Sequence, residues 1–518
     1  MGRIFEMVYE HGVIVKRRCR NCIGIALLYP SIYSAAVASL TYQKLYYFIN
    51  MIEYVYAERF VAKKLKGVED PPQSLETGAP LSKFKLIIAP LLYEADYLGL
   101  VRLLLAAGIE PLRERRKGGP IIVIGGPAAI ASPQLALEIA DIVLVGDIEL
   151  TIPKLIDAIY HGNLEEIVCR DGFLTSDCDK PVKRLYVGDL DRSFHPIMQF
   201  RVPGSGEPWG EAFMVEVSRG CPHMCSFCLM AHLDMPFRYR SLNTLLKLIE
   251  EGVQVNKVRR VAFYALSLFD HPQADELIEH VIEMGLSASI GSLRADLLDD
   301  RRVELIARLG QKVLTIAPET LSEKVCKVLR KCVEWDRVVE VSRAAWRYGM
   351  HTKYYLMLGV PGEERKDVEE TARKLAELIS QSPVKNLIRV SVNPLIPKPF
   401  TPLQWAQLIP KKEYKERLKI LKEILRGVHV SELPYNEAVI QVVIHRGDRR
   451  VALALRHAAE MGAGYASIFS YLKRQGVRIE DYTRQLDLNE VPQWHKMVDV
   501  GIPLASLKRA FETLHYSS

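Results

Sequence analysis

The chain has little that would mark a secreted, membrane-spanning or nucleic-acid-binding protein. Its net charge of +7 is small for 518 residues, and its basic stretches at 113–117 and 446–450 are typical of solvated faces. No repeat of fixed period is visible, which argues against a solenoid. Charged residues at positions 6, 10, 17 and 18 interrupt the apolar core that a signal peptide would need. We expect a cytoplasmic protein, with no indication of nucleic acid as a partner.

An uncharged stretch from Ile23 to Gln43 has the length of a membrane span. However, Pro30 follows a strand-like Ile23–Tyr29, and three serines come soon after it. A buried strand that runs into a helix explains this stretch better, so we predict no transmembrane segment.

The first 190 residues predict a Rossmann-like, doubly wound α/β domain. Short, unbroken apolar runs alternate there with amphipathic, helix-like segments, a pattern typical of a parallel sheet covered on both faces. The runs are Ile23–Tyr29, Leu86–Leu91, Ile121–Ile124 and Ile142–Val145. Ligands of such sheets bind beyond the carboxyl ends of the strands, where Gly125, Gly126 and Gly146 stand.

The middle of the chain predicts a partial TIM-like (β/α)6 barrel, because six further strand-like runs alternate with helical segments. They are Phe213–Val217, Arg260–Ala265, Ser287–Ile290, Val313–Ile316, Lys353–Leu358 and Leu387–Val392. Active-site groups of such barrels lie at the carboxyl ends of the strands.

Three domains follow from this pattern: an α/β domain at 1–190, a barrel at 205–410 and a mainly helical domain at 411–518. A segment rich in proline and glycine, Asp189 to Gly210, predicts the connection between the first two. The last domain closes with a helix at about Leu504–Thr513.

Three cysteines in the loop after the first barrel strand are the most informative feature. Cys221, Cys225 and Cys228 form CxxxCxxC, so their thiolates can face a common centre. A [4Fe–4S] cluster usually takes four protein thiolates, and three leave one iron open to another ligand. A structural zinc site that uses His223 or His232, or three unrelated buried cysteines, is the alternative.

With the aromatic Phe227 before its last cysteine, this motif resembles the signature of radical SAM enzymes. The resemblance implies that S-adenosylmethionine binds the open iron. One electron from the cluster then cleaves it to methionine and a 5′-deoxyadenosyl radical, which abstracts hydrogen from a substrate. It also implies a reductant protein, such as a ferredoxin or a flavodoxin, as partner.

Polar residues follow three other barrel strands on the same rim. Arg294, Glu319 and Ser292 are of the types that bind the carboxylate, amine and ribose of S-adenosylmethionine, and Gly359 and Gly362 would let backbone approach the adenine. Taken singly, each is equally explained as a turn or helix cap. Together on one rim they favour a ligand site.

Several stretches resemble radical SAM proteins that carry a cobalamin-binding domain. In the front domain these are Tyr29–Tyr33, Gly125–Pro127 and Val145–Glu149; in the barrel they are Ser292–Asp296 and Thr315–Glu319. One departure is that Tyr29–Ser34 has no histidine where such domains supply a cobalt ligand. Either cobalamin binds here without a histidine ligand, or the domain is a relic that no longer binds cobalamin.

The remaining cysteines leave alternatives open. Cys19 and Cys22 form a CxxC that would join a second cluster only if Cys169 and Cys178 fold towards it; otherwise it is a local thiol pair. We expect Cys326 and Cys332 to be buried structural thiols. In the rigid segment Pro397–Trp405, Lys398 and Trp405 either line the substrate entrance or pack on the core.

The favoured function is a radical SAM enzyme that transfers a methyl group or forms a C–C or C–S bond on an unknown substrate. A methylthiotransferase-like enzyme that modifies tRNA or protein is the second hypothesis, because only Cys19 and Cys22 are present early in the chain. A non-enzymatic iron–sulfur electron carrier is the third, and it would leave the rim motifs unexplained.

Overall fold

The computed structural model describes residues 10–16, 21–64, 66–203, 211–383 and 388–516. The residues at positions 6, 17 and 18, Cys19, the end of the predicted connection and Leu387 lie outside these ranges. Within them, no helix combines the length and the apolar character needed to cross a membrane.

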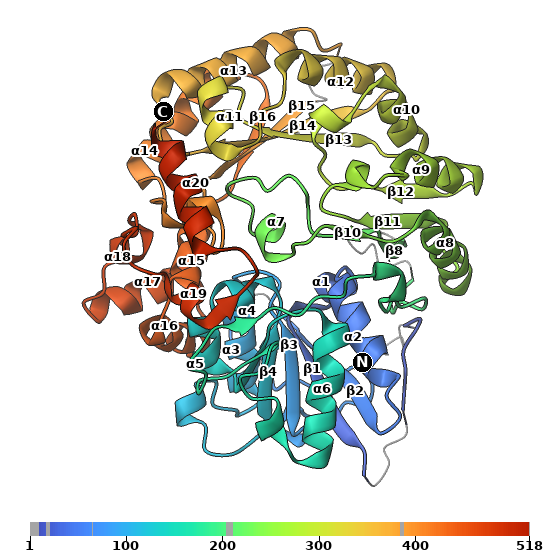
Figure 1. The fold of residues 1–518 in the computed structure, drawn as a ribbon, viewed down its shortest axis with the longest axis vertical. Coiled ribbons are helices and arrows are strands. Elements are labelled where there is room, and N and C mark those ends of the chain that lie inside the picture. Colours follow the sequence, from blue (N-terminus) through green and yellow to red (C-terminus); the bar gives the residue numbers. More distant parts are fainter. Residues whose placement is uncertain (1–9, 17–20, 65, 204–210, 384–387, 517–518) are drawn as a thin grey trace, which may run out of the picture.

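The N-terminal domain is a six-stranded sheet with strand order β2-β1-β3-β4-β5-β6, parallel except for the last strand (Figure 1). The strands are β1 Ile23–Ile32, β2 Val55–Ala62, β3 Leu86–Pro90, β4 Ile121–Gly125, β5 Ile142–Leu144 and β6 Phe173–Leu174. The unbroken apolar runs become strands buried on both faces, as predicted.

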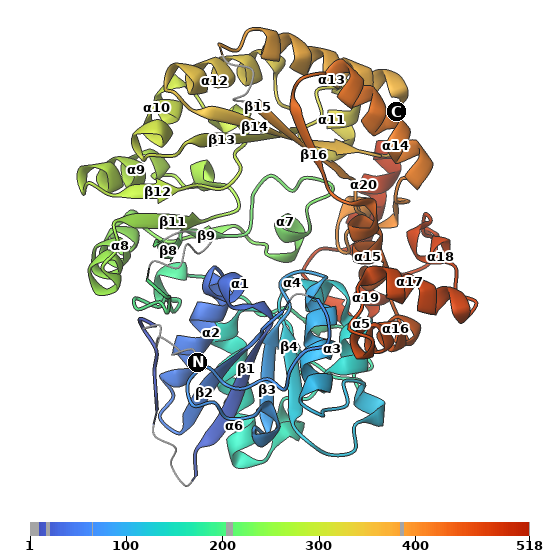
Figure 2. The same ribbon diagram turned by 180° about the vertical axis from the view of Figure 1, so that it is seen from behind.

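Helices cover both faces of this sheet, which confirms the doubly wound arrangement. α2 and α6 pack on one face, and α3 and α5 pack on the other (Figures 1 and 2). The helices are α1 Tyr33–Val37, α2 Leu40–Asn50, α3 Asp96–Ala106, α4 Pro127–Ala131, α5 Pro133–Ile139 and α6 Ile148–His161. The uncharged stretch after residue 23 is thus strand β1 followed by helices α1 and α2.

The middle of the chain forms a curved array of parallel strands above the first domain (Figure 1). The strands are β8 Phe213–Glu216, β11 Arg260–Tyr264, β12 Ser287–Ser289, β13 Val313–Glu319, β14 His351–Leu358, β15 Ile388–Pro394 and β16 His429–Glu432. A parallel bridge between Leu293 and Ile316 links the β8–β12 sheet to the β13–β16 sheet.

All six predicted barrel strands are present, each followed by helices on the outer side of the arc. These helices are α8 Leu242–Asn256, α9 Ala274–Glu283, α10 Asp300–Arg308, α11 Glu323–Leu329, α12 Trp335–Arg347, α13 Arg365–Ser380 and α14 Lys411–Ile424. β16 is a seventh strand within the stretch for which we predicted mainly helices. It pairs with β15, and its residues are mostly exposed. We did not predict this strand because its sequence has no apolar run. The three domain boundaries stay predictions.

The C-terminal helices are α15 Tyr435–His445, α16 Arg449–Glu460, α17 Tyr465–Arg474, α18 Glu480–Thr483, α19 Gln493–Met497 and α20 Leu504–Tyr516. They pack on the α3 and α5 side of the N-terminal domain and share its core (Figure 2). A short parallel pair, β7 Val182–Lys183 with β17 Val498–Asp499, also joins them to that domain. The tail therefore connects the two larger domains along one side.

Candidate functional site

The cysteine loop, Gly220–Cys228, lies between β9 Ser218–Arg219 and helix α7 Leu229–Leu233. Gly220 opens the loop with a φ of +77°, and a side-chain carbon there would meet the Asp234 carbonyl oxygen at 2.6 Å. The backbone N–H of Gly220 donates to the Asp234 carboxylate at 3.1 Å. Only glycine fits this conformation and contact without strain, so the base of the loop is closed tightly.

The three loop cysteines carry free thiols, whereas other cysteines are paired. Disulfides join Cys169 to Cys178 and Cys326 to Cys332, and Cys22 is also disulfide-bonded. The prediction of buried thiols at Cys326 and Cys332 was therefore wrong. Cys169 and Cys178 pair with each other from either side of the short strand β6, and in that state they supply no thiolates to a second cluster.

The two histidines of the zinc alternative have other partners. His223 Nε2 lies 2.8 Å from the Asp270 carboxylate, and His232 Nδ1 lies 2.9 Å from the Cys228 carbonyl oxygen. Among the described residues, no three histidine, cysteine or acidic side chains are arranged to hold one metal ion. In a cluster each thiolate binds a different iron, so the three sulfurs need not meet at one point.

Two cations face the cysteine loop. Arg294 Nη1 lies 3.6 Å from Cys225 Sγ, and the guanidinium also pairs with Asp296 at 2.8 Å. Burial raises the pKa of the Cys225 thiol, while Lys331 and Arg294 act in the opposite direction. The site thus holds positive charge where thiolates would form.

Glu319 is the second predicted ligand residue near the loop. It ends β13 with a φ of +66°, a left-handed conformation that is costly for a residue other than glycine. Its carboxylate pairs with Lys331 at 2.8 Å. Burial raises the pKa of Glu319, and Lys331 opposes that shift. Strained backbone and a buried carboxylate at a strand end are features of functional sites.

The other predicted rim residues have different surroundings. Phe227 packs in one apolar cluster with Met357 and Val360, which stand on either side of Gly359. Gly359 itself has a φ of +83°, and a side-chain carbon there would lie 2.6 Å from Ile409 Cβ. Gly362 follows in an exposed turn, and Ser292 is exposed after β12. Close packing on Ile409 is thus sufficient to explain Gly359.

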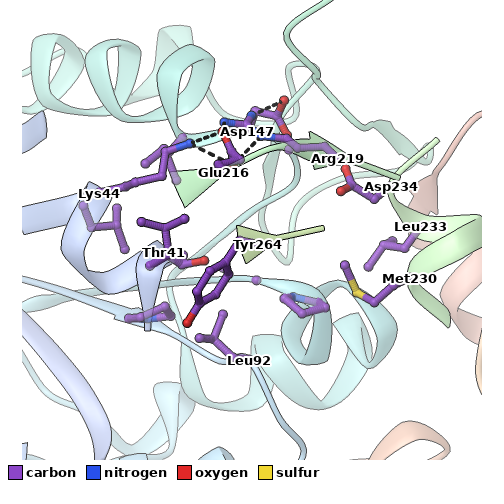
Figure 3. Close-up of a pocket in the computed structure, with 18 of the residues that line it drawn as sticks. Thr41, Lys44, Leu92, Asp147, Glu216, Arg219, Met230, Leu233, Asp234 and Tyr264 are labelled. Carbon is purple, nitrogen blue, oxygen red and sulfur yellow. Dashed lines mark hydrogen bonds and ion pairs between the residues drawn. The ribbon is translucent and has the colours of Figure 1, made fainter. Parts of the chain in front are cut away.

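A cavity of about 460 Å³ lies between the N-terminal domain and the barrel (Figure 3). We call it the interdomain cavity. Its N-terminal side includes Gly125, Gly126 and Gly146, and its barrel side includes Met230 of α7 and Gly291, next to Ser292. The carboxyl ends of β3, β4 and β5 therefore open towards the cysteine loop and its rim, as expected for a doubly wound sheet.

Two of the cavity glycines are also required by the chain itself. Gly126 has a φ of +94°, and a side-chain carbon there would meet the Leu91 carbonyl oxygen at 2.6 Å. Gly146 has a φ of +140°, with the Leu185 carbonyl oxygen at 2.2 Å from the same position. The close backbone packing requires glycine at both positions. Because glycine has no side chain, neither residue fills space in the cavity.

A network of buried charges, which we call the charged wall, closes one side of the cavity. Its members come from both domains: Lys44, Asp147, Glu149, Arg184, Glu216, Arg219, Asp234, Arg238 and Arg240. Arg219 lies at its centre, 2.8 Å from Asp147, 2.7 Å from Glu149 and 2.9 Å from Glu216. Burial opposes ionisation of Asp147 and Glu149, but the neighbouring cations hold the pKa of both carboxyls below the usual range.

Comparison with known proteins identifies the family. Residues 215–375 match the model described as the radical SAM superfamily, and residues 41–187 match that of radical SAM proteins, N-terminal. An uncharacterized protein of Methanocaldococcus jannaschii is 31% identical over 465 residues, covering 87% of this chain and 94% of that protein. The chain belongs to the radical SAM superfamily. A [4Fe–4S] cluster and S-adenosylmethionine are the cofactors that this membership implies, and radical SAM enzymes need a reductant.

Solved structures extend this likeness to the fold of both domains. TsrM of Kitasatospora setae, a radical S-adenosylmethionine methyltransferase with cobalamin and a [4Fe–4S] cluster bound, matches with a TM-score of 0.52 and 12% identity over 74% of each chain. OxsB, a cobalamin-dependent enzyme with aqua-cobalamin and S-adenosylmethionine bound, matches with a TM-score of 0.51 and 12% identity over 95% of this chain and 79% of its own. The chain thus shares its fold, over most of its length, with both of these structures.

The donor set fits a cluster with one open iron, since the loop presents three free thiols beside two cations. Sequence reasoning did not find Lys331 or most of the charged wall, because their partners are distant in sequence. It left Trp405 undecided: the side chain is 1% exposed and packs on Phe511, which confirms the packing interpretation. Lys398 pairs with buried Glu94 at 2.6 Å and does not line the interdomain cavity.

Proposed function

We propose that this radical SAM enzyme transfers a methyl group, with cobalamin bound in the interdomain cavity. The observation that carries the proposal is the position of that cavity. It lies at the carboxyl ends of the N-terminal strands, and its opposite side is formed by residues next to the cysteine loop. A cofactor there would be adjacent to S-adenosylmethionine on the barrel rim.

On the barrel side, Cys221, Cys225 and Cys228 would hold the [4Fe–4S] cluster. Arg294 would bind the carboxylate of S-adenosylmethionine and Glu319 its amine, because both side chains lie beside the loop. Ser292, Gly359 and Gly362 remain candidates for the ribose and adenine, and Phe227 for packing beside the cluster. When bound, these cofactors supply the one-electron chemistry, while the protein orients them and excludes water.

On the N-terminal side, Gly125, Gly126 and Gly146 would let the cobalamin lie close to the strand ends. No histidine is among the residues that line the cavity, so cobalamin would bind here without a histidine on cobalt. The charged wall offers carboxylate and guanidinium groups to the amide side chains of a corrinoid. The volume of about 460 Å³ falls within the range of cofactor sites.

The two solved structures support this proposal, since both have cobalamin bound and have a fold similar to that of this chain. Methylthio transfer stays the second candidate because its enzymes have the same barrel. It requires a second cluster, and Cys169 and Cys178 supply no thiolates to such a cluster while they form a disulfide. We place the enzyme in the cytoplasm, with a ferredoxin or flavodoxin as electron donor.

Anaerobic reconstitution tests the enzyme class. We expect about four irons per chain for one cluster and about eight for two. Reduced protein given S-adenosylmethionine should release 5′-deoxyadenosine, and Cys225→Ala should abolish that release. Cys178→Ala is a control outside the loop and the turn packed on it, and it should keep its iron. Eight irons would favour methylthio transfer, and no 5′-deoxyadenosine from fully loaded protein would refute the enzyme class.

Corrinoid retention tests the cofactor assignment separately. After incubation with cobalamin and gel filtration, the wild-type protein should keep the corrinoid absorbance. Leu92→Trp places a large ring in the cavity and should reduce retention at least tenfold. Leu75→Trp is the control, since Leu75 is 40% exposed and lies outside the cavity lining. Wild-type protein without bound corrinoid would refute cobalamin-dependent methyl transfer.

A further inference from the structure

The turn after helix α11 lies against the cysteine loop and is closed by a disulfide. The helix ends at Arg330, which has a left-handed φ of +51°, and the chain then turns back so that Cys332 bonds to Cys326. Inside this turn the backbone N–H of Lys331 donates to the Cys326 carbonyl oxygen at 3.1 Å. The backbone of Lys331 is therefore fixed in two ways: by its own hydrogen bond to Cys326 and by the disulfide of the next residue, Cys332.

The same turn is packed directly on the cysteine loop. The backbone N–H of Ser226, between Cys225 and Cys228, donates to the Leu329 carbonyl oxygen at 3.0 Å. Phe227 packs in an apolar cluster that includes Val325, Val328 and Leu329 of α11. Displacement of the turn would therefore displace the loop.

The side chain of Lys331 is directed into the site. Its ammonium lies 2.8 Å from Glu319 Oε1 and 5.9 Å from the centre of the Phe227 ring, and the side chain is 9% exposed. Lys327, on helix α11 just before this turn, is by contrast 61% exposed and pairs with Glu323 on the surface.

We propose that Lys331 is a positioning residue of the cofactor site, held in place by the disulfide-closed turn. Its ion pair orients Glu319 towards S-adenosylmethionine, and its charge faces the cysteine loop. This inference rests on the proposed function, because it assumes a cluster on the loop. An electron added to a cluster adds negative charge, and the potential of a cluster depends on the charges around it. A buried cation beside the loop therefore favours the reduced state.

Lys331→Met tests this role in the anaerobically reconstituted, full-length enzyme. A redox titration of the cluster, followed by electron paramagnetic resonance, should show a midpoint potential shifted to more negative values. Binding of S-adenosylmethionine, measured by calorimetry, should weaken about tenfold, the size expected for one charged contact. Lys331→Arg should restore most of both values, and the exposed control Lys327→Met should leave both unchanged.

The contribution of the turn is tested by the double variant Cys326→Ser, Cys332→Ser. It should shift both quantities in the same direction as Lys331→Met, but less. If Lys331→Met loses its iron, Lys331→Gln takes its place; iron loss in both variants with a fully loaded Lys331→Arg also supports a role of the charge. Wild-type potential and affinity in Lys331→Met or Lys331→Gln overturn the inference. A wild-type protein that releases no 5′-deoxyadenosine refutes the proposed function instead.

Discussion

The charged groups of the charged wall and those beside the cysteine loop have different partners. In the wall, four carboxylates and five cations from both domains pair with one another, and Arg219 alone contacts three carboxylates. At the loop, Arg294 and Lys331 have one carboxylate each and also face free thiols. Every carboxylate of the wall is paired with at least one cation, whereas the cations at the loop also lie beside the thiols that would hold a cluster. We infer that the wall joins the two domains and that the loop holds the cluster.

The largest effect should come from breaking the wall at its centre. Arg219→Met leaves Asp147, Glu149 and Glu216 buried without their shared partner, and loss of one partner from a buried network costs about 3 kcal/mol or more. Chemical denaturation of the protein without cofactors should show this loss in unfolding free energy. Arg301→Met, which removes a 65% exposed arginine, should leave the unfolding free energy nearly unchanged. Equal losses in both variants would contradict the importance of the wall.

A smaller loss of stability is expected at low pH, because His195, which lies beside the wall, becomes protonated more easily in the unfolded chain. Burial lowers the pKa of His195 to about 3, and its Nε2 accepts the backbone N–H of Glu216 at 3.1 Å. The unfolded chain, with an ordinary histidine pKa of about 6.5, binds more protons below that pH. Stability should therefore fall as the pH drops from about 6.5 towards 3, by about 2 kcal/mol at pH 5.

His195→Gln sharpens this test, because an amide oxygen accepts the same bond but does not titrate. The difference in unfolding free energy between pH 7 and pH 5 should be smaller in this variant than in the wild type by about 2 kcal/mol. An identical pH dependence in the two proteins would assign the acid sensitivity to other groups.

The smallest effect on stability, and a selective effect on binding, is expected at the loop. Arg294→Met should weaken S-adenosylmethionine binding about tenfold, or about 1.4 kcal/mol, because it removes a cation beside Cys225. The unfolding free energy should change by less than about 1 kcal/mol, since Arg294 pairs with a half-exposed Asp296. The measurements are calorimetry and denaturation. The comparison between the two regions fails if Arg294→Met destabilises the fold as much as Arg219→Met.

Much of the fold could be predicted because it depends on local pattern. The unbroken apolar run at Ile121–Ile124 and the strand-like run at Lys353–Leu358 each lie within a strand, as predicted. β16 could not be found, since a mostly exposed strand at the edge of a sheet has no apolar signal. The disulfide between Cys326 and Cys332 was missed because cysteines on helix-like sequence do not reveal their partner.

The sequence by itself determined the chemistry of the loop, because CxxxCxxC brings three thiols to one short segment whatever the rest of the chain does. It also determined the strands whose ends hold Gly125 and Arg294. Only the tertiary structure decided that Lys331 reaches Glu319 and that Lys44 and Arg219 close one cavity from two domains. Such contacts join residues far apart in the chain, and their energy depends on burial that only the assembled domains create.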